Sequence, residues 1–248
     1  MIRIYSENEI EILRQGGKIL AKIIEELKKE VKPGITTKHL NKVAENLVFS
    51  WGAEPSFKGF EGFPAALCTS INEEIVHAVP GKRKLKEGDI LSLDFGVRFE
   101  GYCTDMAITV PVGKIDKKIK KLIRVTKETL KIGIKQAKPG NHLGDIGYAI
   151  QDYAEKNGFN VVQELVGHGV GKKVHEEPKI PNYGSPDEGP ELKSGMVLAL
   201  EPMVTIDDWH VEKTKNGSGY KTVDNSLSAH FEHTIAITPK GPKVLTQL

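Results

Sequence analysis

Cysteine is scarce in this 248-residue chain. Cys68 and Cys103 are its two cysteines, and they form no Cys-x-x-Cys motif. Two thiols in a chain of this size do not make a disulfide framework. We therefore expect a protein of a reducing compartment, and predict that it is cytoplasmic.

Long hydrophobic runs are also missing. No segment approaches the eighteen or so apolar residues that span a bilayer. The first residues, Met1 to Ile4, give way to polar sequence at Ser6, without the apolar core of a signal peptide. We expect neither a transmembrane helix nor a membrane partner.

The chain also lacks an excess of charge of one sign. The 35 basic and 33 acidic residues give a formal net charge of +2, which offers no support for nucleic-acid readout or membrane-surface binding. Hydrophobic residues make up 39% of the chain and charged residues 27%, as in ordinary globular proteins, which argues against disorder.

Hydrophobic periodicity predicts helices and strands in alternating blocks. Ser6 followed by Glu9 is a capping-box pattern for the first helix, and Thr36 or Thr37 caps the second. The predicted helices cover 7–30, 37–50, 115–137 and 142–157. The predicted strands cover 66–71, 90–98, 102–112, 160–167, 194–205, 229–237 and 243–246, with a loop at 52–64 and a hairpin or loop at 207–226.

The order is two helices and then strands, and it occurs twice. This favours an α+β fold with two similar halves, in which helices pack on a largely antiparallel sheet. No linker separates the halves, so we predict a single domain over 1–248, with halves of approximately 1–112 and 113–248.

Two acids flank a predicted hairpin. If Phe99 and Glu100 form its loop, Asp94 and Asp105 lie directly opposite each other, with Cβ atoms roughly 4.5–5.5 Å apart. Small neighbours such as Ser92 and Gly96 share that face and leave space above it. Like charges so placed repel, and a proton or a cation must neutralise one of them.

Later predicted strands carry further candidate ligands. Glu201 shares a face with Ala199 and Met203, Glu232 shares one with His230, and His168 ends a strand. Four carboxylates would balance two divalent cations, whereas one cation would leave buried charge. The alternative is that these acids are ordinary solvated surface residues, as most acids are. The residue pattern leaves both readings open.

Several segments resemble the motifs of type I methionine aminopeptidases. They are Leu93-Asp94, Gly101-Tyr102-Cys103-Thr104-Asp105, Gly167-His168-Gly169-Val170-Gly171, His175-Glu176-Glu177-Pro178, Leu200-Glu201-Pro202-Met203, Glu232-His233-Thr234 and Asn72-Glu73-Glu74-Ile75-Val76-His77. The resemblance covers nearly the whole chain, in order. It implies the pita-bread fold, with two pseudo-symmetric α+β halves around a central antiparallel sheet.

The resemblance also implies a role for each matched residue. Asp94 would bind one metal ion, Asp105 and Glu232 would bridge two, His168 would bind the second, and Glu201 would complete the site. Oxygen ligands with one imidazole suit Mn, Fe, Co or Zn, and two-metal aminopeptidases are a known class. Glu201 would transfer protons, while His77 and His175 would contact the substrate.

The family's methionine pocket corresponds here to Phe57, Phe60, Phe63 and Cys68, next to His77. Aromatic rings make favourable contacts with a thioether, although loop aromatics also pack without any such role. Two residues depart from the family pattern. Val174 stands where Phe is frequent, and Ser218 where Trp is frequent. Both make the rim of the pocket more open, so we expect a less strict selection of methionine than the family pattern implies.

The function implied is removal of the initiator methionine from peptides and nascent proteins whose second residue is small. The family further suggests a monomer, with the ribosome as a candidate partner. A prolidase or proline aminopeptidase of the same superfamily is one alternative. A non-catalytic pita-bread protein that binds a partner is another, but such proteins typically lose metal ligands, and all five are present here.

Overall fold

A computed structural model describes residues 1–215 and 217–248. Its four long helices are α1 (Glu7–Glu30), α2 (Thr37–Ser50), α3 (Lys117–Gln136) and α4 (Leu143–Lys156). Ser6 and Glu9 form the predicted capping box at α1, and Thr36 caps α2. No helix within the described residues is long and apolar enough to cross a bilayer.

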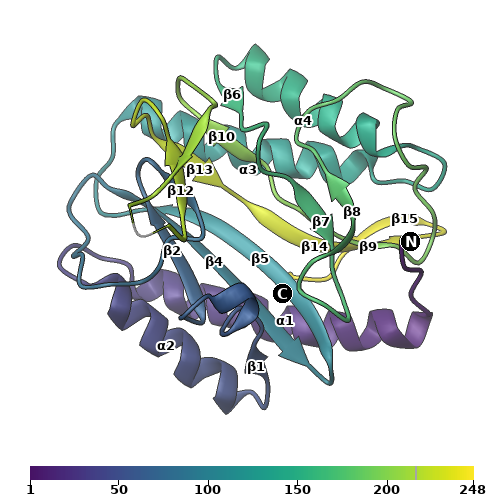
Figure 1. The fold of residues 1–248 in the computed structure, drawn as a ribbon, viewed down its shortest axis with the longest axis horizontal. Coiled ribbons are helices and arrows are strands. Elements are labelled where there is room, and N and C mark those ends of the chain that lie inside the picture. The colour runs from purple at the N-terminus through teal and green to yellow at the C-terminus, as the bar shows by residue number, and fades with distance from the viewer. Residues whose placement is uncertain (216) are drawn as a thin grey trace.

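Within these residues, a nine-stranded antiparallel sheet forms the centre of the molecule (Figure 1). Its path runs β1-β4-β5-β14-β9-β7-β8, with β2 paired to β4 and β15 paired to β14. The bounds are β1 (Glu54–Pro55), β2 (Leu67–Ile71), β4 (Ile90–Phe99), β5 (Tyr102–Pro111), β7 (Gly167–Gly169), β8 (Glu176–Ile180), β9 (Val197–Leu200), β14 (Glu232–Thr238) and β15 (Gly241–Val244).

Two three-stranded sheets accompany the large one. The first joins β13 (Ser228–His230), β10 (Met203–Thr205) and β6 (Asn160–Val161). The second joins β11 (Val211–Lys213), β12 (Tyr220–Thr222) and β3 (Glu74–Val76), so the predicted hairpin or loop at 207–226 contains a hairpin. A short 3₁₀ turn, η1 (Phe60–Gly62), lies in the loop after β1.

The helices lie in two pairs along the sheet. In Figure 1, α1 and α2 line one side of it and α3 and α4 the other. Two apolar clusters correspond to the pairs: one contains Leu20 and Leu40 with Leu93, and the other contains Leu122 and Ile146. The predicted boundary between halves, at 112 and 113, falls between β5 and α3.

The loop of the hairpin that carries Asp94 and Asp105 lies one residue later in the sequence than predicted. Phe99 pairs with Tyr102, so the loop is Glu100-Gly101, and both loop residues have positive φ, 48° and 79°. Such a turn requires positive φ at both positions, and glycine meets that need at Gly101. Phe99 therefore stays in the strand.

The change of loop corrects the predicted pairing of the acids. Asp94 pairs with Ala107, and Asp105 pairs with Gly96. The two aspartates are thus diagonal rather than directly opposite neighbours. Their shared face is unchanged, because moving the centre of the loop by one residue changes the pairing by two positions.

Three predicted strands are also broken. The strand predicted at 160–167 is β6 and β7, that at 194–205 is β9 and β10, and that at 229–237 is β13 and β14. Pro202 lacks an N–H for the ladder and marks the second break. Consequently Glu201 and Met203 do not share a strand face, and neither do Glu232 and His230.

The packing of α1 leads to a stability prediction. A Cβ at Gly17 would lie 2.5 Å from the backbone O of Leu245, in the segment that pairs with β14. Gly17→Ala gains helix propensity of ~1 kcal/mol, but the clash with a backbone atom outweighs it. We expect a net loss of about 1–2 kcal/mol in unfolding free energy, measured by chemical denaturation. The neighbouring exposed Lys18→Ala is the control and should be nearly neutral. A stabilised Gly17→Ala protein would contradict the packing.

Candidate metal centre

All the residues predicted for the site line one cavity of about 410 Å³. Its lining includes the five candidate ligands, both substrate histidines and the pocket residues, namely Asp94, Asp105, His168, Glu201, Glu232, His77, His175, Phe57, Phe60, Phe63 and Cys68. The two residues that depart from the family pattern, Val174 and Ser218, line the same cavity. The structure therefore brings together side chains from β2, β4, β5, β7, β14 and several loops.

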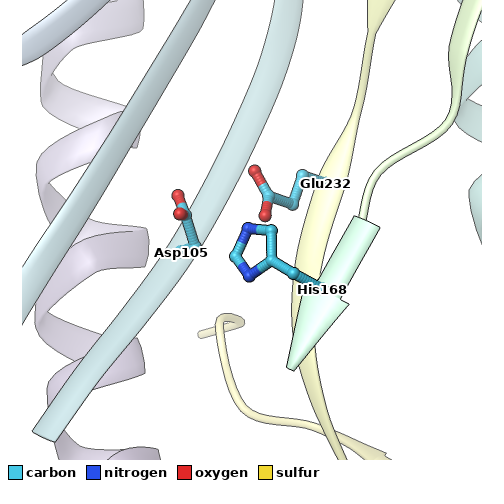
Figure 2. Close-up of side chains that lie close together, drawn as sticks. All are labelled: Asp105, His168 and Glu232. Atoms are coloured by element: carbon cyan, nitrogen blue, oxygen red, sulfur yellow. The ribbon is translucent and has the colours of Figure 1, made fainter. Parts of the chain in front are cut away.

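Three ligand types converge at the centre of this cavity. Asp105 on β5, His168 on β7 and Glu232 on β14 each offer one ligand atom, and these atoms lie within 4.8 Å of one another (Figure 2). Their strands are neighbours or near neighbours in the large sheet: β5 pairs with β14, and β14 and β7 both pair with β9. Two aspartyl or glutamyl oxygens and an imidazole at this spacing could hold a divalent cation.

Glu201 and Asp94 complete the group of acids. Glu201 follows β9 directly, and its Oε1 lies 3.5 Å from Nε2 of His168. Asp94 is 7% exposed and lies two positions from Asp105 along the same face of the hairpin. Its register partner on β2 is Cys68, which places the thiol beside this carboxylate.

Burial makes the charged state of these acids costly. It raises the pKa of Asp94 to about 6 and that of Glu201 to about 8. The pKa values of Asp105 and Glu232 are raised well above their ordinary values, first by burial and then by the negative charges of their neighbours. Without compensating positive charge, the folded protein favours protonated acids here.

Several buried polar atoms in the cavity make no hydrogen bond within the described residues. Oδ1 of Asp94 and Oε1 of Glu232 are two of them, and both ring nitrogens of the nearby buried His230 are in the same condition. A buried polar atom left without a partner is unfavourable by ~1–3 kcal/mol. Cations bound by the carboxylates would satisfy these oxygens, so the residues fit a metal site.

The orientation of His168 also suits metal binding. Its Nδ1 lies 2.9 Å from the carbonyl O of Gly169, which can only accept, so Nδ1 carries the proton. The lone pair is then on Nε2, the atom nearer Glu201. A backbone carbonyl that fixes the tautomer in this way is typical of metal-binding histidines.

His230 was not singled out from the sequence as a site residue. It is 1% exposed, and its Nε2 lies 3.6 Å from Oε2 of Glu201. Its backbone N–H donates to Oγ1 of Thr109, and its carbonyl accepts from the same hydroxyl. The sequence offered one signal, a histidine two residues before Glu232, but strand alternation gave it no distinct role.

The two predicted substrate histidines lie at the mouth of the cavity. His77 follows β3 with φ of 58°, an unusual conformation for a residue with a side chain. Burial lowers the pKa of its imidazole to about 4, so the ring is neutral near pH 7. The ring of His175 meets His168 edge-on, with centroids 4.4 Å apart, and meets Phe60 at 5.1 Å.

A second group of potential ligands lies elsewhere, at the start of α4. It consists of His142, Asp145 and Asp187. Asp145 already accepts from the backbone N–H groups of His142 and Asp187, at 2.7 and 3.1 Å. Helix capping accounts for this arrangement.

Comparison with known proteins gives the family. Residues 11–239 match the model of metallopeptidase family M24. The chain is 50% identical over 248 residues to methionine aminopeptidase 1 of Bacillus subtilis, with all of both chains covered, and 49% identical to a methionine aminopeptidase of Clostridium perfringens, with 99% of both covered. It belongs to the methionine aminopeptidases of family M24. The type I resemblance found in the sequence is confirmed, and a divalent metal requirement follows from the family.

Solved structures of the family agree with the fold. A methionine aminopeptidase from Thermotoga maritima superimposes with a TM-score of 0.98 at 45% identity, covering all of both chains. The predicted α+β pita-bread fold is therefore confirmed. An Xaa-Pro dipeptidase from Bacillus anthracis shares the fold at a TM-score of 0.79 and 23% identity, and this chain covers 62% of its length.

The raised carboxyl pKa values predict how the metal-free protein responds to pH. A carboxyl whose folded pKa is above its unfolded value contributes stability at low pH, and this contribution is lost as the pH rises through the folded pKa. For Glu201 the interval runs from 4.5 to about 8. We expect the stabilisation by added divalent metal, measured as a shift in thermal midpoint, to be larger near pH ~9 than near pH ~5.

The matched control for this prediction is Glu201→Gln, which cannot ionise. The metal-free variant should lose less stability than the unsubstituted metal-free protein between the two pH values. An equal loss in both proteins would assign the pH dependence to groups outside the cavity.

Proposed function

We propose that this chain removes N-terminal methionine from peptides and nascent proteins with a small second residue, by hydrolysis assisted by two divalent metal ions. One observation carries the proposal: a single cavity is lined both by four largely buried acids with His168 and by the aromatic side chains of Phe57, Phe60 and Phe63. An ion-binding group beside an apolar pocket suits the amine and the side chain of an N-terminal methionine.

Asp94, Asp105, His168, Glu201 and Glu232 would hold the two ions. The unpartnered oxygens of Asp94 and Glu232 and the raised carboxyl pKa values support this assignment. Four carboxylates balance the charge of two divalent ions. The donor set of oxygens and one imidazole favours Mn, Fe, Co or Zn. When bound, the ions supply a water molecule of lowered pKa and polarise the scissile carbonyl.

Glu201 would act as the proton carrier of the reaction. Its carboxylate lies within 3.6 Å of both His168 and His230, so its position is constrained from two sides. A carboxyl whose burial opposes ionisation holds a proton more readily than an ordinary glutamate. It would accept the proton of the attacking water and return it to the departing amine.

His77 and His175 would contact the peptide group at the mouth of the cavity. The neutral imidazole of His77 can donate one hydrogen bond to the substrate and accept another. Donors placed where negative charge develops stabilise the transition state. His175 lies over His168, close to where the scissile carbonyl would lie in this assignment.

The methionine side chain would occupy the aromatic part of the cavity. Phe57 and Cys68 are buried there, and Phe60 and Phe63 pack against the same cluster. Burial and the neighbouring carboxylates raise the pKa of the Cys68 thiol well above its ordinary value, so it stays neutral. An uncharged wall of rings and a thiol suits an unbranched thioether.

The peptide beyond the first residue needs a route out. A second cavity of about 630 Å³ shares His77, His168, His175 and Glu201 with the first and extends past the N-terminal segment. Extended substrates, including nascent chains, can follow this opening. We carry over from the family a cytoplasmic monomer, with the ribosome as a candidate partner.

Loss of one candidate ligand should abolish turnover. Glu232 is 2% exposed and contributes to the converging group of ligands. We expect Glu232→Ala to lower kcat by more than about 100-fold with metal restored, because loss of even an outer-shell partner costs ~10–100-fold. Peptide hydrolysis and bound-metal content are measured together. The exposed Glu26→Ala is the control, and near-full turnover of Glu232→Ala would disprove the ligand assignment.

Substrate choice tests the proposed specificity. We expect Met-Gly-Met to be cleaved with a kcat/KM at least ~10-fold above that of Met-Leu-Met, because a confined site discriminates between side chains by ~10–200-fold. X-Pro peptides should be poor substrates. Faster cleavage of X-Pro peptides than of Met-Gly-Met would favour the prolidase alternative. Because Val174 and Ser218 depart from the family pattern at the pocket, the preference for methionine is measured separately. The comparison is between the kcat/KM values of Met-Gly-Met and Leu-Gly-Met.

A further inference from the structure

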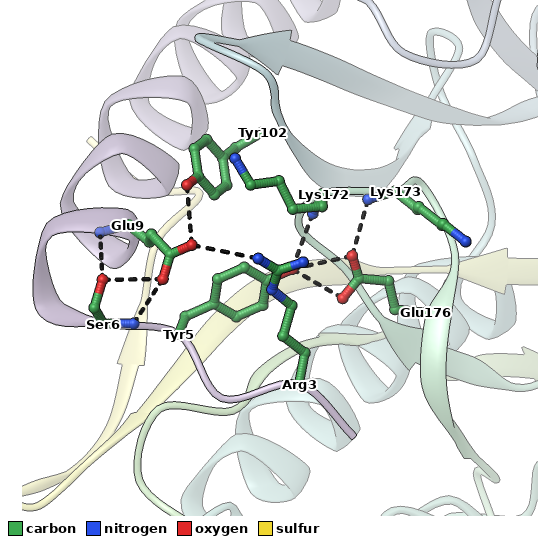
Figure 3. A network of polar contacts seen from close by, with 8 residues as sticks. All are labelled: Arg3, Tyr5, Ser6, Glu9, Tyr102, Lys172, Lys173 and Glu176. Atoms are coloured by element: carbon green, nitrogen blue, oxygen red, sulfur yellow. Dashed lines mark hydrogen bonds and ion pairs between the residues drawn. The ribbon is translucent and has the colours of Figure 1, made fainter. Parts of the chain in front are cut away.

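The segment before α1 contacts the loop that carries His175. Tyr5 is 4% exposed, and its backbone N–H donates to the carbonyl of Gly195 at 2.8 Å. Its ring meets Tyr102 edge-on, with centroids 6.3 Å apart. The Tyr5 side chain points toward the 171–176 loop, which follows β7 and ends at Glu176, the first residue of β8 (Figure 3).

The hydroxyl of Tyr5 joins the two ends of that loop. It donates to the carboxylate of Glu176, with oxygens at 3.0 and 2.8 Å. It also accepts from the backbone N–H of Lys172 at 2.9 Å. Glu176 in turn accepts from the backbone N–H of Lys173 at 2.9 Å. One hydroxyl and one carboxylate therefore fix the backbone on both sides of His175.

The space around this hydroxyl is closely fitted. A Cβ at Gly171 would lie 2.1 Å from the Tyr5 oxygen. The carbonyl of Gly171 accepts from the backbone N–H of Cys103 at 2.6 Å, which ties the same loop to β5. Burial and the nearby Glu176 charge raise the pKa of the Tyr5 hydroxyl well above its usual value, so it remains a donor.

The ring of His175 has no hydrogen-bonded anchor of its own within residues 1–215 and 217–248. It meets the rings of Phe60 and His168 edge-on and lies near the charge of Glu61. Its position therefore depends on its backbone neighbours. Val174 is buried at 2% exposure on one side, and Glu176 is held by Tyr5 on the other.

We propose that Tyr5 is a positioning residue for the reaction: through Lys172 and Glu176 it fixes the loop that holds His175 against the substrate. The inference rests on the role proposed above for His175. It assigns to the segment before α1 a part in catalysis, although Tyr5 does not touch the cavity where the chemistry occurs. Misplacement of a catalytic group by about 1 Å can cost ~100-fold in rate.

Tyr5→Phe tests this directly, because it removes the hydroxyl and keeps the ring. In the metal-loaded enzyme we expect kcat to fall by about 10- to 100-fold with KM changed by less than about threefold. Bound metal and thermal midpoint are measured on the same samples. Unchanged kcat in a folded, metal-loaded Tyr5→Phe enzyme would overturn the proposal.

Tyr102→Phe is the matched control. It removes another largely buried tyrosine hydroxyl of the same network, one that donates to Oε1 of Glu9 at 3.0 Å. Among the described residues, the hydrogen bond of this hydroxyl goes to Glu9 and not to the 171–176 loop. The Tyr102 ring does contact the loop, because Nζ of Lys172 lies 3.4 Å from its centroid, but Tyr102→Phe keeps that ring. We expect a comparable change in thermal midpoint but a kcat within about twofold of the unsubstituted enzyme. Equal losses of kcat in the two variants would point to a general structural effect and overturn the proposal.

A double-mutant cycle with His175→Ala connects Tyr5 to its target. In the His175→Ala background, Tyr5→Phe should cause no further loss of kcat, because the positioned group is already absent. The same fold-loss in both backgrounds would overturn the inference while leaving the role of His175 intact. Full activity of His175→Ala itself would instead remove the role of His175, and the inference with it.

If Tyr5→Phe does not fold, variants at Glu176 test the same hydrogen bonds. Glu176→Gln retains an oxygen that can accept from Tyr5 and Lys173, whereas Glu176→Ala retains none. We expect Glu176→Gln to keep most of the activity and Glu176→Ala to match the loss predicted for Tyr5→Phe. Equal activity of the two Glu176 variants would overturn the proposal.

Discussion

The burial of four carboxylates in one cavity is the constraint on which the rest of this structure depends. Asp94, Asp105 and Glu232 are each less than a tenth exposed, and Glu201 lies beside them. Desolvation raises the pKa values of all four, and the negative charges of neighbouring acids add to this for Asp94, Asp105 and Glu232. The cavity therefore favours either protons or cations. A fold that gathers such groups is stable with them charged only when positive charge is bound, so metal binding and folding are thermodynamically linked.

Two of the four acids lie where strands of the large sheet begin or end. Asp94 and Asp105 occupy the interior of a long regular hairpin. Glu201 instead follows the last residue of β9, and Glu232 is the first residue of β14. At both places the chain leaves one sheet and continues in another, which directs the carboxylates of distant segments into one space. The irregular backbone is therefore part of how the site is assembled.

Much of this could be predicted from the sequence, and the failures have a common physical origin. The helix limits followed from local signals, such as the Ser6–Glu9 capping box. The face shared by Asp94 and Asp105 followed from strand alternation. The pairing was wrong because Gly101, with its positive φ, selected the loop position. The breaks at Pro202 and Phe231 were missed because apolar residues continue across each bend. His230 was missed for the same reason, since only the bend brings it beside Glu201.

The proposed ligands and the proposed substrate histidines differ in how the chain supports them. Asp94, Asp105, His168 and Glu232 lie on strands, whose ladders fix the backbone within a fraction of an ångström. His77 and His175 lie on irregular segments beside the opening, where a peptide must enter and leave. Such segments have few backbone partners and need additional contacts to hold a side chain in one place. For His77 the φ of 58° and the edge-on ring of Tyr220 are such constraints. For His175 the corresponding contacts come from Glu176, its neighbour in the sequence, and from Tyr5, which lies 171 positions from Glu176. Because of that separation, no local pattern in the sequence could have revealed the contact between Tyr5 and Glu176.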